Sequence, residues 1–131
     1  MNTTNLDTLE DRLEQPEPSY SSEEEAQIGD MLDQYGIPFF YQQATIVYDQ
    51  GENKLIYPAF TMSDYGPAIV DYMKESYGDR YKYKSELYEQ NQIPAVLITP
   101  EYLKNPVWQQ QLYQQLNKMY TQSAQYQTMY K

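Results

Sequence analysis

The sequence predicts an α+β protein in which a mixed β-sheet lies between helices. Three observations support this fold class. Two stretches with helical periodicity enclose a block of short aromatic and β-branched segments, a short apolar run follows, and the chain ends in a longer amphipathic stretch. The length of 131 residues fits a single domain.

The first predicted helix spans residues 22–35. It opens on a capping box, in which the Ser22 hydroxyl can accept from the amide of Glu25 and the Glu25 carboxylate can reach back to the Ser22 amide. Apolar side chains then follow at helical spacing. Gly36 stands where a left-handed C-terminal cap is expected, so both ends of this helix are marked in the sequence.

Three short strands are predicted next, over residues 39–48, 54–60 and 68–72. The first two are separated by a glycine-containing stretch typical of a hairpin turn. A second turn over residues 61–66 precedes the third strand. Because both turns are short, we expect these strands to form an antiparallel meander.

A helix and a strand follow the meander. Residues 80–90 show helical spacing, and the continuously apolar residues 94–99 predict a central strand covered on both faces. Its helical connection suggests a parallel crossover. A C-terminal amphipathic helix starts just after Pro106, and its glutamine-rich face is either plain surface or an assembly surface. The apolar stripe of this helix consists of Trp108, Leu112, Leu116, Met119 and Tyr120.

The sequence contains neither cysteine nor histidine. Their absence excludes disulfides, thiolate zinc sites, cysteine nucleophiles and Ser-His-Asp catalysis. Any catalysis must therefore use carboxylates, lysine, arginine, tyrosine or serine. Oxygen-ligated ions such as Mg²⁺ are the metals that remain.

The net charge of −10 is concentrated at the N-terminus. Residues 1–25 hold eight acidic residues and one arginine, a net charge of −7, whereas residues 26–131 carry −3. The polar composition of residues 1–20 predicts a disordered acidic arm ahead of one domain at 21–131. The nearly neutral body disfavours strong nucleic-acid binding, which needs many basic contacts.

No hydrophobic run approaches the length of a membrane span, and the N-terminus lacks a basic region followed by an apolar stretch. We therefore expect a soluble, cytoplasmic protein without a membrane partner. Tyrosine occurs 16 times, and glutamine is equally frequent. An excess of tyrosine is common at protein interfaces, although a bias in residue usage explains it equally well.

Several short motifs follow one another between residues 22 and 108. They are Ser22-x-x-Glu25-x-x-Ile28, Tyr57-Pro58-Ala59-Phe60, Ile69-Val70-Asp71-Tyr72 and Tyr77-x-x-Arg80-x-x-x-Lys84-x-x-x-Tyr88. In order and spacing they resemble the PD-(D/E)XK nuclease-like superfamily, which includes restriction and repair endonucleases. The resemblance implies a restriction-endonuclease-like αβββαβ core.

The resemblance also implies a site. In that family an aspartate after the proline and a second acid further on bind Mg²⁺ beside the scissile phosphate, and a lysine two residues later positions the attacking water. This chain has Ala59 in place of that aspartate and Met73 in place of that lysine. Asp71 stands in the second acid position, and Glu25 matches a glutamate of the first helix. An engineered inactive variant would also carry alanine at the metal position.

Two functions follow from the resemblance. The loss of the aspartate and the lysine indicates a catalytically inactive nuclease-like domain that acts as a binding or structural module, without a cofactor and with a protein partner or a second copy. The alternative is an active Mg-dependent nuclease with a rearranged site, in which Asp71, Glu25 and Asp64 hold the metal and Lys84 replaces the lost lysine. A third hypothesis rests on charge alone: a small regulatory subunit whose acidic arm binds a basic partner.

Each candidate residue also has a structural explanation. Glu25 completes the capping box, and Asp64 is a typical turn residue. Lys84 and Arg80 can simply form the solvated face of a helix. Asp71 lies within an apolar strand, where an unpaired carboxylate would be costly, so it needs a cation, a hydrogen-bond donor or solvent.

Overall fold

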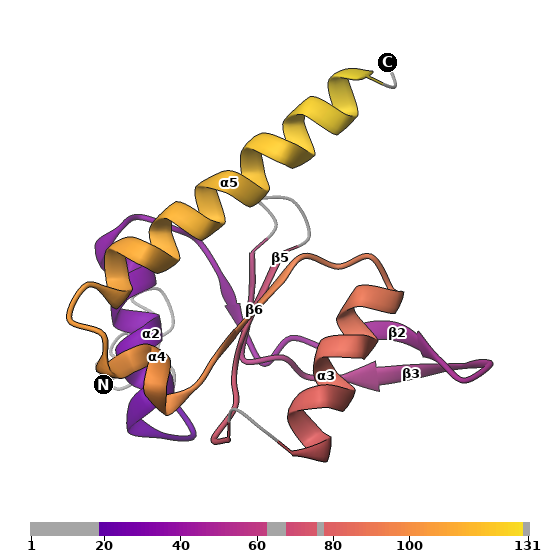
Figure 1. Cartoon of the computed structure of the whole chain (residues 1–131), viewed down its shortest axis with the longest axis horizontal. Coiled ribbons are helices and arrows are strands. Elements are labelled where there is room, and N and C mark those ends of the chain that lie inside the picture. The colour runs from indigo at the N-terminus through magenta and orange to yellow at the C-terminus, as the bar shows by residue number, and fades with distance from the viewer. Residues whose placement is uncertain (1–18, 63–67, 76–77, 130–131) are drawn as a thin grey trace, which may run out of the picture.

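The structure is a computed structural model that describes residues 19–62, 68–75 and 78–129. A four-stranded sheet has the order β1-β4-β5-β6, with β4 antiparallel to both β1 and β5, and β5 parallel to β6. Three helices lie on one side of this sheet and α3 lies on the other (Figure 1). The predicted class, a mixed sheet between helices, is therefore confirmed. The four strands are β1 (Phe40–Tyr41), β4 (Phe60–Met62), β5 (Ala68–Tyr72) and β6 (Ala95–Ile98).

The first helix, α2 (Glu23–Gln34), lies one residue inside its predicted bounds at each end. The Ser22 hydroxyl accepts from the Glu25 amide at 3.2 Å, which confirms this half of the capping box. Gly36 has a φ of +69°, and the amide of Ile37 bonds to the Leu32 carbonyl at 2.9 Å. These bonds satisfy the last carbonyls of the helix as a left-handed glycine cap does.

Tyr20, at the end of the predicted arm, packs against the folded body. Its ring centroid lies 4.9 Å from that of Tyr41 and 6.0 Å from that of Phe60. It also covers Gly29, where a Cβ atom would come within 2.3 Å of the Tyr20 hydroxyl oxygen. The packed part of the chain thus includes Tyr20, whereas residues 1–18 of the predicted arm lie outside the described residues.

The antiparallel pairing of the predicted meander is confirmed, but the first two predicted strands are each interrupted. Residues 39–48 form two strands, β1 and β2 (Thr45–Asp49), because Gln42 between them has a φ of +54°, which strand geometry does not allow. Residues 54–60 likewise divide into β3 (Glu52–Ile56) and β4 around Pro58, which has no amide to donate. β1 and β2 pair with β4 and β3 in one hairpin register, and β4 pairs with β5. β1 pairs with β4 in the four-stranded sheet, so each interrupted segment joins that sheet only at the end away from the hairpin turn.

The strands β2 and β3 form a separate antiparallel hairpin. Its loop is the two residues Gln50 and Gly51, both with positive φ, as tight hairpins require. The turn predicted between the first two strands is thereby confirmed, although the hairpin belongs to its own two-stranded sheet. It lies beside α3 (Asp79–Gln90), away from the other helices (Figure 1).

The later elements follow the prediction more closely. β5 has the predicted bounds, α3 begins one residue early, and β6 is parallel to β5, with Val70 opposite Val96. The expected central position of β6 is wrong, because β6 is an edge strand of the described sheet. Its apolar run reflects cover by helices and not a neighbour on both edges. Asp64 and the rest of residues 63–67 lie outside the described residues.

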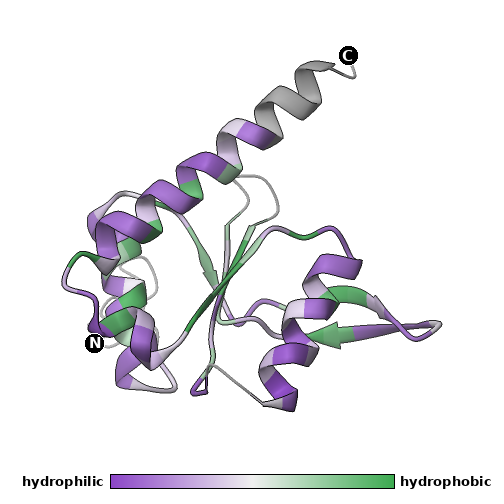
Figure 2. Cartoon of the chain, in the orientation of Figure 1, coloured by the Kyte–Doolittle hydropathy of each residue, from purple (hydrophilic) through white to green (hydrophobic). Residues whose placement is uncertain are grey.

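The main core lies between the sheet and two helices, α2 and α5 (Trp108–Met129). A short helix, α4 (Pro100–Lys104), precedes α5 and is capped by the Thr99 hydroxyl. The polar side of α5 and the apolar strands are visible in Figure 2. No helix in the described ranges is both long enough and apolar enough to cross a bilayer. The largest buried core residues include Ile28, Met31, Leu32, Phe60, Ile98, Leu112 and Leu116.

The predicted stripe of α5 is buried only over its first half. Trp108, Leu112 and Leu116 are buried in the core, and Met119 packs at its margin. Tyr120 is half exposed, because α5 there leaves the body and continues outward (Figure 1). The apolar stripe therefore packs against the core over the first three turns of α5 only.

Candidate functional site

Asp71 lies near the C-terminal end of β5 and faces α3. Its neighbour Val70 belongs to the core on the other side of the sheet, and successive strand residues point to opposite faces. Asp71 is only 8% exposed. An aspartate at this depth must find partners inside the protein.

Three hydrogen-bond donors and one ammonium group of the chain itself surround the Asp71 carboxylate. Oδ1 accepts from the amides of Ala59 at 3.2 Å and Tyr72 at 3.1 Å. Oδ2 accepts from the Tyr88 hydroxyl at 2.8 Å and lies 3.8 Å from Lys84 Nζ. Both oxygens are therefore engaged, and the need for a partner that the sequence indicates is met within the fold.

Lys84 and Tyr88 reach Asp71 together because they are one helical turn apart on α3. The Lys84 ammonium lies 5.8 Å from the centroid of the Tyr88 ring, and its side chain is 17% exposed. Lys84 is thus not on a solvated face. Arg80, one turn earlier, is exposed.

Tyr88 acts as a permanent donor in this cluster. Burial raises the pKa of its hydroxyl far above the usual value, and the charge of Asp71 and the hydrogen bond to it raise that pKa further. The hydroxyl therefore stays protonated and cannot serve as a base. The sequence indicates that Asp71 needs a donor, but it does not identify Tyr88 as that donor.

The two positions that the resemblance marks as lost are both buried. Ala59 is 4% exposed and Met73 is 5% exposed, and neither side chain offers an oxygen ligand. The Ala59 amide donates directly to Asp71, so Ala59 and Asp71 are neighbours where β4 pairs with β5. Ala59, Met73 and Asp71 together offer only one carboxylate, which is a poor match for Mg²⁺ because this ion takes about six oxygen ligands. Among the described residues, no three acidic side chains form a group that could hold a metal ion.

Glu25 lies in a different place from Asp71. Its carboxylate accepts from the Tyr41 hydroxyl at 2.5 Å, a partner outside the capping box. Glu25 and Met73 both line a cleft of about 440 Å³, and neither Asp71 nor Lys84 lines it. The structure thus brings Asp71 and Lys84 together and places Glu25 with Met73. Other residues along the cleft are Ser22, Tyr72, Lys74 and Arg80.

The cleft carries mixed charge. Lys74 and Arg80 take part in none of the ion pairs among the described residues, but Glu25 and Glu75 line the same cleft. Burial raises the pKa of the Tyr72 hydroxyl, and the nearby carboxylates Glu24, Glu101 and Glu25 raise it further. Acidic side chains therefore lie close to Tyr72, in a cleft that also carries the two basic side chains.

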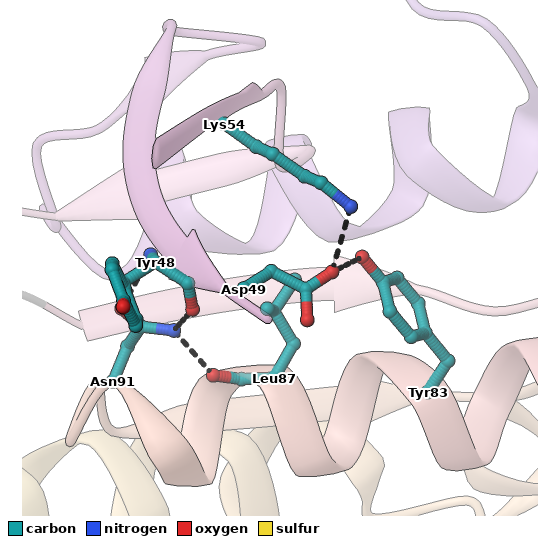
Figure 3. Close-up of polar contacts among 6 residues, drawn as sticks. All are labelled: Tyr48, Asp49, Lys54, Tyr83, Leu87 and Asn91. Atoms are coloured by element: carbon teal, nitrogen blue, oxygen red, sulfur yellow. Dashed lines mark hydrogen bonds and ion pairs between the residues drawn. The ribbon is translucent and has the colours of Figure 1, made fainter. Parts of the chain in front are cut away.

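A second buried carboxylate, Asp49, joins the hairpin to α3 (Figure 3). Asp49 Oδ2 accepts from Lys54 Nζ at 2.9 Å and from the Tyr83 hydroxyl at 2.7 Å. The bond from Tyr83 and then the bond from Lys54 lower the pKa of Asp49. This cluster was not predicted, because Asp49 lies between the predicted strands 39–48 and 54–60, in the expected turn.

Asn91, just past the end of α3, fixes the outer edge of β2 (Figure 3). Its Oδ1 accepts from the Tyr48 amide at 2.8 Å, and its Nδ2 donates to the Tyr48 carbonyl at 3.0 Å. Nδ2 also donates to the Leu87 carbonyl at 2.9 Å. The side-chain amide thus takes the place of a neighbouring strand at this residue.

The Asp71 carboxylate has both oxygens occupied by partners within the protein. A general base needs a lone pair within reach of the substrate, and the hydrogen bonds of Asp71 direct both of its oxygens at protein donors. What the arrangement does best is hold α3 against β4 and β5. Comparison with models of protein families, with curated proteins and with solved structures found no match for this chain.

Proposed function

We propose that this chain is a catalytically inactive PD-(D/E)XK nuclease-like domain that acts as a binding or structural module. One observation carries the proposal: the carboxylate that the resemblance assigns to the metal, Asp71, is engaged by three hydrogen bonds and one ion pair from its own chain. In this reading an internal cluster has replaced the metal site.

The chemistry around Asp71 supports the inactive reading. A divalent cation on Oδ2 would compete with the Lys84 ammonium for the same oxygen and would displace the Tyr88 hydroxyl. Both displaced groups would then be buried without a partner, at a cost of several kcal/mol. Ala59 offers only a methyl group in exchange.

The arrangement of strands supports the scaffold part of the proposal. A helix precedes the sheet, the segment with Ala59 leads into β4, and Asp71 follows on the antiparallel neighbour β5. The crossover through α3 to the parallel strand β6 is also what the resemblance implies. The proposed relation to the superfamily rests on this order and on the motifs together.

The surface favours a protein partner over a nucleic acid. Residues 26–131 carry a net charge of −3, and the cleft beside Glu25 contains acidic as well as basic side chains. Phosphate binding draws its affinity from many Lys and Arg contacts, which this body lacks. Several aromatic and aliphatic side chains are instead exposed, as at many protein interfaces.

The direct test combines calorimetry with cleavage assays. We expect no heat of binding with Mg²⁺ or Mn²⁺ at millimolar concentrations, and no cleavage of plasmid DNA, single-stranded DNA or RNA. Saturable metal binding together with cleavage that is lost in Asp71→Asn would overturn the proposal. As a matched gain-of-function variant, Ala59→Asp combined with Met73→Lys should acquire Mg²⁺-dependent thermal stabilisation, with circular dichroism to confirm that it folds.

The active nuclease with a rearranged site remains the second candidate, and one observation favours it. Lys84 Nζ lies 3.8 Å from Asp71 Oδ2, where a lysine relocated to α3 would stand. This candidate predicts that Lys84→Gln and Asp71→Asn abolish cleavage alike. The hypothesis of an acidic arm that binds a basic partner stays a prediction, because residues 1–18 lie outside the described part of the chain.

A further inference from the structure

The β2–β3 hairpin has two unlike faces. On the side of α3, Val47 and Asp49 are buried. On the outer face, Ile46 is 69% exposed and Leu55, its cross-strand neighbour, is 57% exposed. Figure 2 shows the apolar stretches of both strands beside α3. A soluble protein rarely leaves adjacent large apolar side chains uncovered without a use for them.

Two tyrosines extend this outer face at its ends. Tyr48 lies two residues beyond Ile46, toward the turn, and is 58% exposed. Tyr57 follows Leu55 by two residues, just past the end of β3, and is 60% exposed. Period-two alternation places Ile46, Tyr48 and Leu55 on one side of the ribbon together with the uncharged Asn53 opposite Tyr48, and the same alternation carried one step past β3 adds Tyr57.

The charges of the hairpin lie on the opposite side. Asp49 is opposite Glu52 and Val47 is opposite Lys54, so these residues share the face toward α3. Asp49 and Lys54 are also paired with each other at 2.9 Å. The outer face of the hairpin is therefore free of charged side chains. The bonds of Asp49 to Tyr83 and of Tyr48 to Asn91 hold the hairpin against α3.

We propose that this outer face, formed by Ile46, Tyr48, Leu55 and Tyr57, binds the same face of a second copy of the chain. A two-fold contact requires a self-complementary patch, and a strip of uncharged apolar and aromatic side chains meets that requirement. In an antiparallel stack, Tyr48 of one copy meets Tyr57 of the other. The aliphatic pairs then meet in the middle, with Leu55 beside Leu55, across a spacing of about 10 Å between the two ribbons.

Charge and area support a second copy as the occupant. Because each chain carries a net charge of −10, two copies repel each other wherever their acidic surfaces meet, and an uncharged face avoids that repulsion. Covering these four side chains removes about 500 Å² from water in each copy, or about 1,000 Å² in the pair. That area is at the lower limit for a specific interface, so the dimer should be reversible and dependent on concentration.

The test measures the oligomeric state of the full chain by sedimentation equilibrium, from about 1 μM to about 1 mM. We expect the wild type to form dimers within this range. Leu55→Glu places two carboxylates side by side at the centre of the contact and should weaken dimerisation by at least about tenfold. Val107→Glu is the matched control, because Val107 is similarly exposed, at 53%, but precedes α5.

Two outcomes would overturn the proposal: a wild type that stays monomeric throughout the range, or a Leu55→Glu variant that dimerises as the wild type does. Circular dichroism confirms that each variant is folded. A second measurement tests the arrangement itself, since mixing Leu55→Glu with Leu55→Lys should restore association above that of either variant alone. The inference does not depend on whether the Asp71 cluster is catalytic, so either proposal can fail without the other.

Discussion

Asp71 and Asp49 both contact α3, Asp71 from the four-stranded sheet and Asp49 from the hairpin. Each is buried on a strand, each accepts a hydrogen bond from a tyrosine of α3, and each has a lysine nearby. They differ in what surrounds the partners. Asp71 also receives two backbone amides and its lysine is largely buried, whereas the lysine of Asp49 is 43% exposed.

The comparison shows that the shorter ion pair need not be the stronger one. Lys54 lies 2.9 Å from Asp49, and Lys84 lies 3.8 Å from Asp71. An exposed lysine regains its solvation when the pair breaks, so a surface pair contributes little to stability. A buried lysine left alone keeps an uncompensated charge in the interior, so the longer pair is the costlier one to break.

The largest effect should come from removing the carboxylate whose partners are better buried. Asp71→Ala leaves the Lys84 ammonium and the Tyr88 hydroxyl without their acceptor, and we expect a loss of about 3–5 kcal/mol in the free energy of unfolding. Urea denaturation followed by circular dichroism measures it. Asp49→Ala is the matched variant and should lose less, because Lys54 can turn to solvent. Equal losses of unfolding free energy at the two positions would contradict the explanation by burial of the lysine partner.

The two tyrosines of α3 should differ in the same direction. Tyr88→Phe removes the hydroxyl donor of a buried carboxylate, and we expect a loss of about 1–3 kcal/mol in unfolding free energy. Tyr83→Phe removes an equivalent bond at a side chain that is 41% exposed, where water can replace the donor, so the loss should be smaller. A Tyr83→Phe variant that is the less stable of the two would contradict the comparison.

The smallest effect is the pH dependence of the Asp49 cluster. Because the fold lowers the pKa of Asp49, its contribution to stability is present above the pKa of an unfolded aspartate, about 3.9, and is lost as the pH falls through the folded value. Asp49→Asn should therefore have a lower Tm than the wild type at pH 7, and this gap should close below about pH 4.

Thermal unfolding at a series of pH values measures that gap. Asp30→Asn is the control, because Asp30 is an exposed acid on α2, away from the hairpin. Its Tm difference from the wild type should stay nearly constant over the same range. A gap for Asp49→Asn that persists unchanged in acid would remove the charge-based explanation.

Local signals explain which elements the sequence could predict. The capping serine Ser22 and the cap glycine Gly36 mark the ends of α2 by hydrogen bonds within a few residues. Asp71 was recognisable because a carboxylate inside an apolar strand is an anomaly in any fold. Its partners were not, since Tyr88 and the Ala59 amide are 17 and 12 residues away along the chain.

The errors arose where distant contacts decide the geometry. Gln42 gives no sequence sign of a positive φ, so the break between β1 and β2 was invisible. The pairing of β1 with β4 continues the register of the β2–β3 hairpin, so the turn signal specified the partners but not the interruption between them. The apolar run of β6 measures its cover by helices and says nothing about how many strands border it.

The position of α3 has a consequence for association. A two-stranded ribbon is barely stable in water by itself, and here Tyr83 and Asn91 anchor it to α3. Local unfolding of that helix would therefore melt the ribbon with it. Whatever binds the ribbon then shields the helix amides from hydrogen exchange as well, so occupancy of an outer surface and protection of an inner element become thermodynamically linked.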